Sequence, residues 1–245
     1  MFDTCIFDFY GTLADIQTDE TEPEVWKKLS QFYAFYGACY VPSEIKERYE
    51  KITQSMTEGK LGIRRDSHES FPEIQIEKVF LELFSEKGIH VGKELAIHTG
   101  QFFRVLTTKY LTLYDGTEYM LNSIKEKGKK IYLLSNAQRI FTEYEMNSLN
   151  ITKYFDGIFI SSDYEFRKPD IRFFRKLIDT YHILPETAIM IGNDGVCDIL
   201  GAKKAGLRTL YVHSNISPNE DVPNADYMLN EMNMKRIQEI LLYNK

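Results

Sequence analysis

The feature that most constrains the fold is a set of short apolar runs that alternate with amphipathic segments after residue 116. Runs of this length, bounded by polar or turn-forming residues, predict buried strands, and the segments between them predict helices. Together with a similar run that opens the chain, the expected strands lie near residues 3–8, 130–134, 157–161, 187–192, 208–212 and 226–229. Strands that alternate with helices are typical of βαβ units, so the sequence predicts an α/β fold built on a parallel sheet.

A different pattern occupies residues 16–110, where the periodicity is helical and almost no strand is indicated. Breaks near Pro23, at 41–44 and at 71–73 predict the starts of separate helices, which together would form a small bundle. The sequence leaves the oligomeric state open, because one aromatic cluster fits either the interior of this bundle or an interface between subunits. That cluster consists of Phe32, Tyr33, Phe35 and Tyr36.

Composition argues against several classes of partner. A chain of 245 residues that is 43% hydrophobic can fill a sizeable core. No apolar run approaches the roughly 18 residues of a membrane span and no signal peptide opens the chain, so we expect a cytoplasmic protein without a membrane partner. The net charge of -6, spread without long runs of like charge, argues against nucleic acid as a partner. Three widely separated cysteines predict reduced thiols rather than disulfides or a zinc site.

Four of the predicted strands lead into polar, reactive side chains. Asp8 follows the first run, Ser135 and Asn136 follow the second, Lys168 lies beyond the third, and Asp194 follows the fourth. In a parallel α/β sheet the carboxyl ends of the strands meet at one edge, where ligands bind. The sequence therefore predicts one site to which all four segments contribute.

These segments resemble the motifs of the haloacid dehalogenase-like hydrolase superfamily. The stretch from Asp8 to Thr12 is similar to the first motif of that family, Ser135 to the second, Lys168 to the third, and Asp194 with Asp198 to the fourth. The resemblance covers essentially the whole chain, including the order of the motifs and the helical insertion after the first of them.

The resemblance implies a Rossmann-like core with an inserted α-helical cap that closes over small soluble substrates. In these terms residues 1–15 and 111–245 form the catalytic core and residues 16–110 form the cap. The implied activity is hydrolysis of a small phosphorylated metabolite through an aspartyl-phosphate intermediate.

Each candidate catalytic residue has a chemical reason to be there. A carboxylate such as Asp8 can attack phosphorus or carbon to form an ester that water then hydrolyses. Thr12 and the backbone N–H groups of its turn can hold phosphoryl oxygens. Ser135 and Asn136 end a strand and open a helix, where a hydroxyl and N–H groups converge on an anion. The Lys168 ammonium can neutralise charge on the nucleophile and on the transferred group.

The acidic residues of the fourth motif predict a metal site. Asp194 and Asp198 are four residues apart and can share one face of a helix that follows the strand. Beside Asp8 they would repel one another unless a cation holds them, and Mg²⁺ suits carboxylates, waters and a substrate phosphate. The backbone carbonyl of Tyr10 would complete the ligand set. Asn193 stands where many relatives place the first aspartate of this motif, so the choice between Asn193 and Asp194 stays open.

Tyr10 is the main departure from the phosphatase pattern, in which a second aspartate two residues after the nucleophile protonates the leaving group. A phenol with a reference pKa near 10 is poorly matched to that task at neutral pH. The loss of general acid–base help typically costs about 10²- to 10⁴-fold in rate. We therefore expect a slow phosphatase that favours good leaving groups such as acyl or aryl phosphates.

Two alternatives follow from the same residue. The pattern Asp-x-Tyr-Gly-Thr is similar to that of the metal-independent 2-haloacid dehalogenases, whose halide leaves without protonation. Those enzymes place a tyrosine where this chain has Phe174, and they grip substrate with a cap arginine, for which Arg48, Arg64 and Arg65 are candidates. The second alternative is a binding or regulatory protein with little turnover on the same fold.

Overall fold

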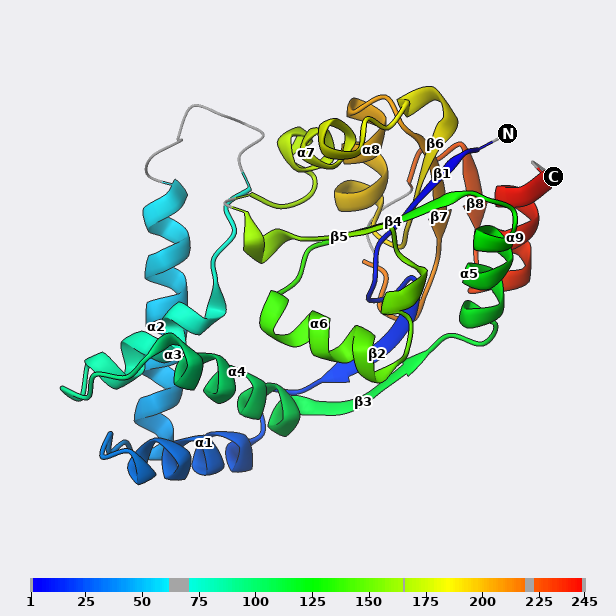
Figure 1. Ribbon diagram of the computed structural model, residues 1–245. Helices are drawn as coiled ribbons and strands as arrows, with labels where there is room; N and C mark the ends of the chain where they lie inside the picture. The colour runs from blue at the N-terminus through cyan, green and yellow to red at the C-terminus, as the bar shows by residue number, and fades with distance from the viewer. Residues whose placement is uncertain (1, 62–70, 165, 219–222, 244–245) are drawn as a thin grey trace.

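A six-stranded sheet in which every neighbouring pair of strands is parallel forms the centre of the molecule (Figure 1). The structure, a computed structural model, describes residues 2–61, 71–164, 166–218 and 223–243. The order across the sheet is β5-β4-β1-β6-β7-β8. The strands are Thr4–Phe7 (β1), Lys130–Ser135 (β4), Gly157–Ile160 (β5), Ala188–Gly192 (β6), Arg208–Val212 (β7) and Tyr227–Leu229 (β8). All six coincide with predicted strands, so the expected parallel α/β sheet is confirmed.

Strand β1 is central because the chain adds strands on both of its sides. Phe7, its last residue, is paired with Leu133 of β4 on one side and with Ile191 of β6 on the other. The chain segments that leave β1, β4 and β6 therefore emerge side by side at the carboxyl edge. This is the place in an open α/β sheet where ligands bind.

Helices cover both faces of the sheet, and alternating strand residues pack against each layer. Phe7, Leu133 and Ile191 face the layer of α5 and α9, whereas Ile6, Leu134 and Met190 face that of α7 and α8. The helices of the core are α5 (Thr117–Glu126), α6 (Arg139–Ser148), α7 (Ile171–Tyr181), α8 (Gly201–Lys204) and α9 (Met234–Tyr243). Short turns of 3₁₀-helix occupy Thr152–Tyr154, Ser161–Asp163 and Pro185–Thr187, and a π-helix occupies Gly195–Leu200.

Four further helices build a separate hydrophobic core, and we call them the helical unit. They are α1 (Pro23–Phe35), α2 (Pro42–Leu61), α3 (Ile76–Ser85) and α4 (Lys93–Thr107). On α1 the buried apolar positions include Val25, Trp26, Leu29 and Tyr33, as the helical period predicts. The aromatic cluster is divided, since Tyr33 lies in the core whereas Phe35 is 88% exposed.

The helical unit is joined to the sheet by an antiparallel pair of strands that the sequence did not predict. The strands are β2 (Ala14–Thr18) and β3 (Thr108–Leu113), and they bring the two crossings of the chain side by side (Figure 1). Most of the residues in these two strands are exposed or half-buried, and only Ala14 is fully buried. The strands therefore lack the apolar run from which a buried strand can be predicted. The predicted divisions at 15/16 and at 110/111 both fall within this pair, and the division into two domains stays a prediction.

One predicted helix start is wrong. The break at 71–73 does not open a helix, because α3 begins at Ile76. Instead the segment contacts the core: Arg167 donates its backbone N–H to the carbonyl of Phe71 over 3.2 Å, and the Ser161 hydroxyl donates to the Glu73 carboxylate over 2.6 Å. Glu73 therefore joins the segment that precedes α3 to the core and does not cap a helix.

The three cysteines are free thiols that differ in accessibility. Cys5 is buried, Cys197 is partly buried, and Cys39 is exposed. Burial raises the pKa of both Cys5 and Cys197 to about 12, and Asp194 contributes at Cys197. None of the helices in the described part of the chain is both long and apolar enough to cross a membrane.

These thiols should differ in reactivity, because the thiolate is the species that attacks a disulfide reagent. We expect a chromogenic disulfide reagent to modify Cys39 rapidly in the native protein, and Cys5 and Cys197 only after a denaturant is added. The substitution Cys39→Ser should remove the fast phase. Rapid modification of a second thiol in the native variant would contradict the burial of the other two.

Candidate active site

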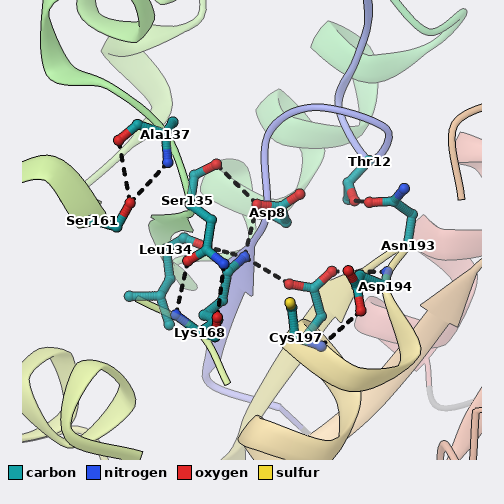
Figure 2. Close-up of polar contacts among 12 residues, drawn as sticks. Asp8, Thr12, Leu134, Ser135, Ala137, Ser161, Lys168, Asn193, Asp194 and Cys197 are labelled. Atoms are coloured by element: carbon teal, nitrogen blue, oxygen red, sulfur yellow. Dashed lines mark hydrogen bonds and ion pairs between the residues drawn. The ribbon is translucent and has the colours of Figure 1, made fainter. Parts of the chain in front are cut away.

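Asp8 occupies the centre of the site. It follows β1 directly, and its backbone N–H donates to the carbonyl of Ile191 over 2.9 Å, which continues the sheet by one residue. The side chain is buried, and one carboxylate oxygen, Oδ1, accepts from Lys168 Nζ at 2.8 Å and from Ser135 Oγ at 2.9 Å (Figure 2). A carboxylate placed between an ammonium and a hydroxyl is held in one orientation by charge-assisted hydrogen bonds.

Lys168 joins the segments of three strands. Its side chain is almost completely buried, and Nζ donates to Asp8 Oδ1, to Asp198 Oδ1 at 2.6 Å and to the carbonyl of Leu134 at 2.7 Å. Burial alone would lower the pKa of Lys168, but the two carboxylates outweigh that effect and raise the pKa above its ordinary value. The ammonium therefore stays charged through neutral pH and uses all three of its donors.

Asn136 positions Lys168 through the main chain. Its amide Nδ2 donates to the carbonyl of Lys168 over 2.9 Å, and its Oδ1 accepts the N–H of Lys168 over 2.8 Å. Next to it, the backbone N–H of Ala137 donates to Ser161 Oγ over 2.9 Å. The loops after β4 and β5 are therefore tied together, and the Asn136 side chain bonds to the Lys168 backbone.

Asp198 enters the site from the π-helix that follows β6. Its carboxylate is buried, and Oδ2 accepts the backbone N–H of Asp194 over 3.0 Å. Burial raises the pKa of Asp198, and Lys168 opposes the shift. A Cβ on Gly192 would lie 2.2 Å from Asp198 Oδ2, so the strand end must be glycine for the carboxylate to fit.

Asp194 and Asn193 make different contacts. Asp194 caps the π-helix, since its Oδ1 accepts the backbone N–H groups of Val196 at 2.9 Å and Cys197 at 2.7 Å. Asn193 is buried against the nucleophile loop, where Thr12 Oγ1 donates to its Oδ1 over 3.4 Å (Figure 2). Gly11 permits this approach, because its φ of 77° and a Cβ position only 2.4 Å from the Asn193 amide exclude other residues.

Tyr10 extends away from these groups, a placement that the sequence did not indicate. Its hydroxyl donates to Glu145 and lies 3.0 Å from the hydroxyl of Thr142, both on α6. Burial and then Glu145 raise the pKa of the Tyr10 phenol further above its ordinary value, so it stays protonated. Arg104 of α4 completes the cluster, with Nε 2.6 Å from Glu145 Oε1.

No motif spacing marks Arg104 and Glu145, which is why the sequence did not reveal them. Of the three arginines proposed to grip substrate, Arg48 is ion-paired with Glu86 within the helical unit. Arg64 and Arg65 lie outside the described residues. Phe174 is fully buried in the core between the sheet and α7.

Comparison with known proteins agrees with this geometry. The model of the haloacid dehalogenase-like hydrolases matches residues 2–206. A glyceraldehyde 3-phosphate phosphatase from Methanothermobacter thermautotrophicus is 28% identical over 158 residues, which cover 58% of this chain and 70% of that protein. A phosphoserine phosphatase from Thermus thermophilus is 27% identical over 167 residues, 67% of this chain and 65% of that protein.

A solved structure of similar fold is a 2-haloacid dehalogenase from Pseudomonas syringae pv. Tomato DC3000, with a TM-score of 0.65, 16% identity and complete coverage of both chains. At that identity the likeness concerns the fold alone. The family model spans most of the chain, and the structure brings Asp8, Ser135, Lys168 and Asp198 together at the carboxyl edge of the parallel sheet. The chain belongs to the haloacid dehalogenase-like hydrolases.

Proposed function

We propose that this hydrolase is a phosphatase of small phosphorylated metabolites and that Asp8 is its nucleophile. The observation that carries the proposal is the buried Asp8 carboxylate, oriented by Lys168 and Ser135 at the carboxyl edge of the sheet. The phosphatases among the relatives support phosphorus rather than carbon as the centre attacked. Residues 16–110, the predicted cap, contain the helical unit and close over the substrate.

The reaction proceeds in two displacements. A carboxylate oxygen of Asp8 attacks phosphorus, the bond to the leaving oxygen breaks, and that oxygen departs with the electron pair. Lys168 and the hydroxyls of Ser135 and Thr12 stabilise the negative charge of the transferred group. Water then attacks phosphorus, the bond from phosphorus to the Asp8 oxygen breaks, and the carboxylate is regenerated as inorganic phosphate leaves. The proton that water loses balances the one that the departed oxygen takes up. The Tyr10 hydroxyl is bonded to Glu145, so the leaving group departs without a proton from that phenol.

Mg²⁺ fits the donors present at this edge. Within the described ranges, no three or more His, Cys, Asp or Glu side chains gather in a metal-binding cluster. Mg²⁺ does not need such a cluster, because it usually binds through one or two carboxylates and completes its shell with waters and substrate phosphate. Asp8, Asp198 and the Tyr10 carbonyl would hold the ion. Asn193 is better placed than Asp194 to join them, since its amide faces Thr12 of the nucleophile loop whereas the Asp194 carboxylate is turned toward the backbone of the π-helix. The bound ion would supply charge neutralisation for the phosphoryl oxygens.

A second candidate function is metal-independent dehalogenation of a 2-haloacid. The observation that favours it is Tyr10, which stands in place of the acidic residue of phosphatases and is held away from the nucleophile by Glu145. The buried Asp198 argues against it, because extra negative charge would repel a haloacid carboxylate.

The deciding experiment measures phosphate release from para-nitrophenyl phosphate and acetyl phosphate, with Mg²⁺ and with a chelator, beside chloride release from 2-chloropropionate. Metal-dependent phosphate release is the expected result. Chloride release that a chelator does not affect would replace the proposal with the dehalogenase. Activity in neither assay would favour a binding or regulatory protein.

A further inference from the structure

Three side chains from separate elements, Glu145 buried and Tyr10 and Arg104 partly buried, meet beside the active site, and no role of these side chains in the proposed reaction accounts for them. Tyr10 donates its hydroxyl to the carboxylate of Glu145, and Arg104 pairs with the same carboxylate through Nε at 2.6 Å and Nη2 at 3.3 Å. The Arg104 guanidinium also lies 5.6 Å from the centroid of the Tyr10 ring. We call these three residues the Tyr10 network.

The network is held firmly because its charges are withdrawn from water. The Glu145 and Arg104 side chains are 5% and 20% exposed. Displacing one partner of a largely buried ion pair is strongly destabilising, because it leaves the other charge unpaired. The phenol is a neutral donor to a charged acceptor, which is among the stronger hydrogen bonds in proteins. A shift of one member is therefore passed to the others rather than absorbed by solvent.

The three residues of the network link the nucleophile loop, α6 and the helical unit. Tyr10 belongs to the loop that begins at Asp8 and closes on itself, since the N–H groups of Leu13 and Ala14 donate to the carbonyl of Phe9 and that of Gly11 donates to the carbonyl of Ala14. Glu145 lies on α6, which follows the Ser135 strand. Arg104 lies in the last turn of α4, which leads into β3 and so into one of the two crossings between the helical unit and the core (Figure 1).

The outer side of this cluster leaves the helices room to shift. Arg104 and Glu145 line a cavity of about 450 Å³ between α4, β3 and α6, whose remaining walls are mostly apolar. The helices α4 and α6 are in contact at this cavity. A sliding movement of α4 past α6 would carry Arg104 with it and would pull on Glu145 and Tyr10.

We propose that the Tyr10 network couples the position of the helical unit to the loop of the nucleophile, so that Tyr10 is a positioning residue for Asp8 and not its acid. The effect on turnover rests on the proposed phosphatase function, whereas the mechanical coupling does not. The proposal is specific, because the Tyr10 hydroxyl reaches Arg104 through the Glu145 carboxylate that both residues share, and its other contact, the Thr142 hydroxyl, lies on the same helix as Glu145.

The coupling is tested first by hydrogen exchange, which needs no substrate. Arg104→Lys keeps the charge but loses the planar pairing with Glu145. We expect it to speed exchange of the Gly11, Leu13 and Ala14 amides about tenfold, in the range that coupled networks transmit. Tyr10→Phe should have the same effect. Lys125→Met is the matched control, since it removes a partly buried ion pair with Asp156 that does not reach the nucleophile loop. Unchanged exchange in Arg104→Lys would overturn the proposal.

The kinetic test separates positioning from acid catalysis. We expect Tyr10→Phe and Glu145→Gln each to lower kcat about tenfold, with KM nearly constant, and the double variant to fall no further, because the groups act as one unit. The loss should be equal for an aryl phosphate and an alkyl phosphate. A loss confined to the alkyl phosphate would make Tyr10 the acid, and an unchanged kcat in folded variants would leave only a structural role; either result overturns the proposal. If the wild-type protein releases no phosphate, the proposed function fails, and the exchange experiment still decides the coupling.

Discussion

The substitution Asp8→Asn should abolish phosphate release, with a fall in kcat on the order of 10⁴-fold or more. The amide is nearly the same size as the carboxylate but is not a nucleophile, so no aspartyl phosphate can form. The substituted side chain would still contact Ser135 and Lys168, and the fold should be retained. The measurement is turnover of para-nitrophenyl phosphate and acetyl phosphate, with circular dichroism to establish folding.

The same substitution at Asp15 is the matched control. Asp15 lies in β2, where it accepts from Asn215 over 2.9 Å, and it has no part in the proposed reaction. Asp15→Asn should retain the wild-type kcat. Turnover of Asp8→Asn close to that of Asp15→Asn would exclude Asp8 as the nucleophile.

The substitution Lys168→Met should impair both activity and stability. Activity should fall about 10²- to 10³-fold, the usual effect of removing one group that stabilises developing charge. Unfolding free energy should fall by about 3–5 kcal/mol at neutral pH, because two buried carboxylates, Asp8 and Asp198, lose the cation between them. Denaturant titration followed by circular dichroism measures the stability, because the single tryptophan, Trp26, lies in the helical unit and not in the core that holds Lys168.

The stability defect of Lys168→Met should depend on pH. Burial and the neighbouring Asp8 already raise the pKa of Asp198, and the substitution removes the ammonium that opposes this shift. The folded variant then binds a proton more tightly than the unfolded chain does, so its stability rises as pH falls. In the wild type the pKa of Asp198 is already raised to about 7, so the two proteins respond alike below that pH and the defect grows as pH rises above about 7. A defect that stays constant from about pH 6 to pH 9 would contradict the shared ion pair.

Lys129→Met is the appropriate comparison for this variant. Lys129 is also buried, but its ammonium donates to the backbone carbonyl of Phe2, outside the active site. We expect its kcat to remain that of the wild type. An equal loss of activity in both variants would show that removal of any buried lysine disturbs the site.

Much of the core could be predicted because buried parallel strands carry their own signal. The runs that form β4 and β6 are buried along nearly their whole length, so no polar alternation interrupts them. The strands β2 and β3 lack that signal, since most of their residues are exposed or half-buried. The segment at 71–73 has the residues of a helix start, yet Glu73 bonds to Ser161 of the core.

The candidate site also has residues that the sequence could predict and one placement that it could not. Asp8, Ser135 and Lys168 could be brought together from the sequence because each follows a strand, and parallel strands end at one edge. Asp198 could be added to this group because it lies four residues after Asp194, which follows the end of a predicted strand. The direction of the Tyr10 side chain could not be predicted, because it depends on Glu145 and Arg104, which lie far from it along the chain.

The sequence by itself determined the parallel sheet, the order of its reactive segments and the family, since short apolar runs and local motifs are properties of neighbouring residues. Only the tertiary structure decided what those side chains contact. In the structure Asp194 caps a helix, Asn136 hydrogen-bonds to the Lys168 backbone, and Tyr10 donates to Glu145. The physical reason is that a buried polar group must find partners wherever packing places them, and packing joins residues that the chain keeps far apart.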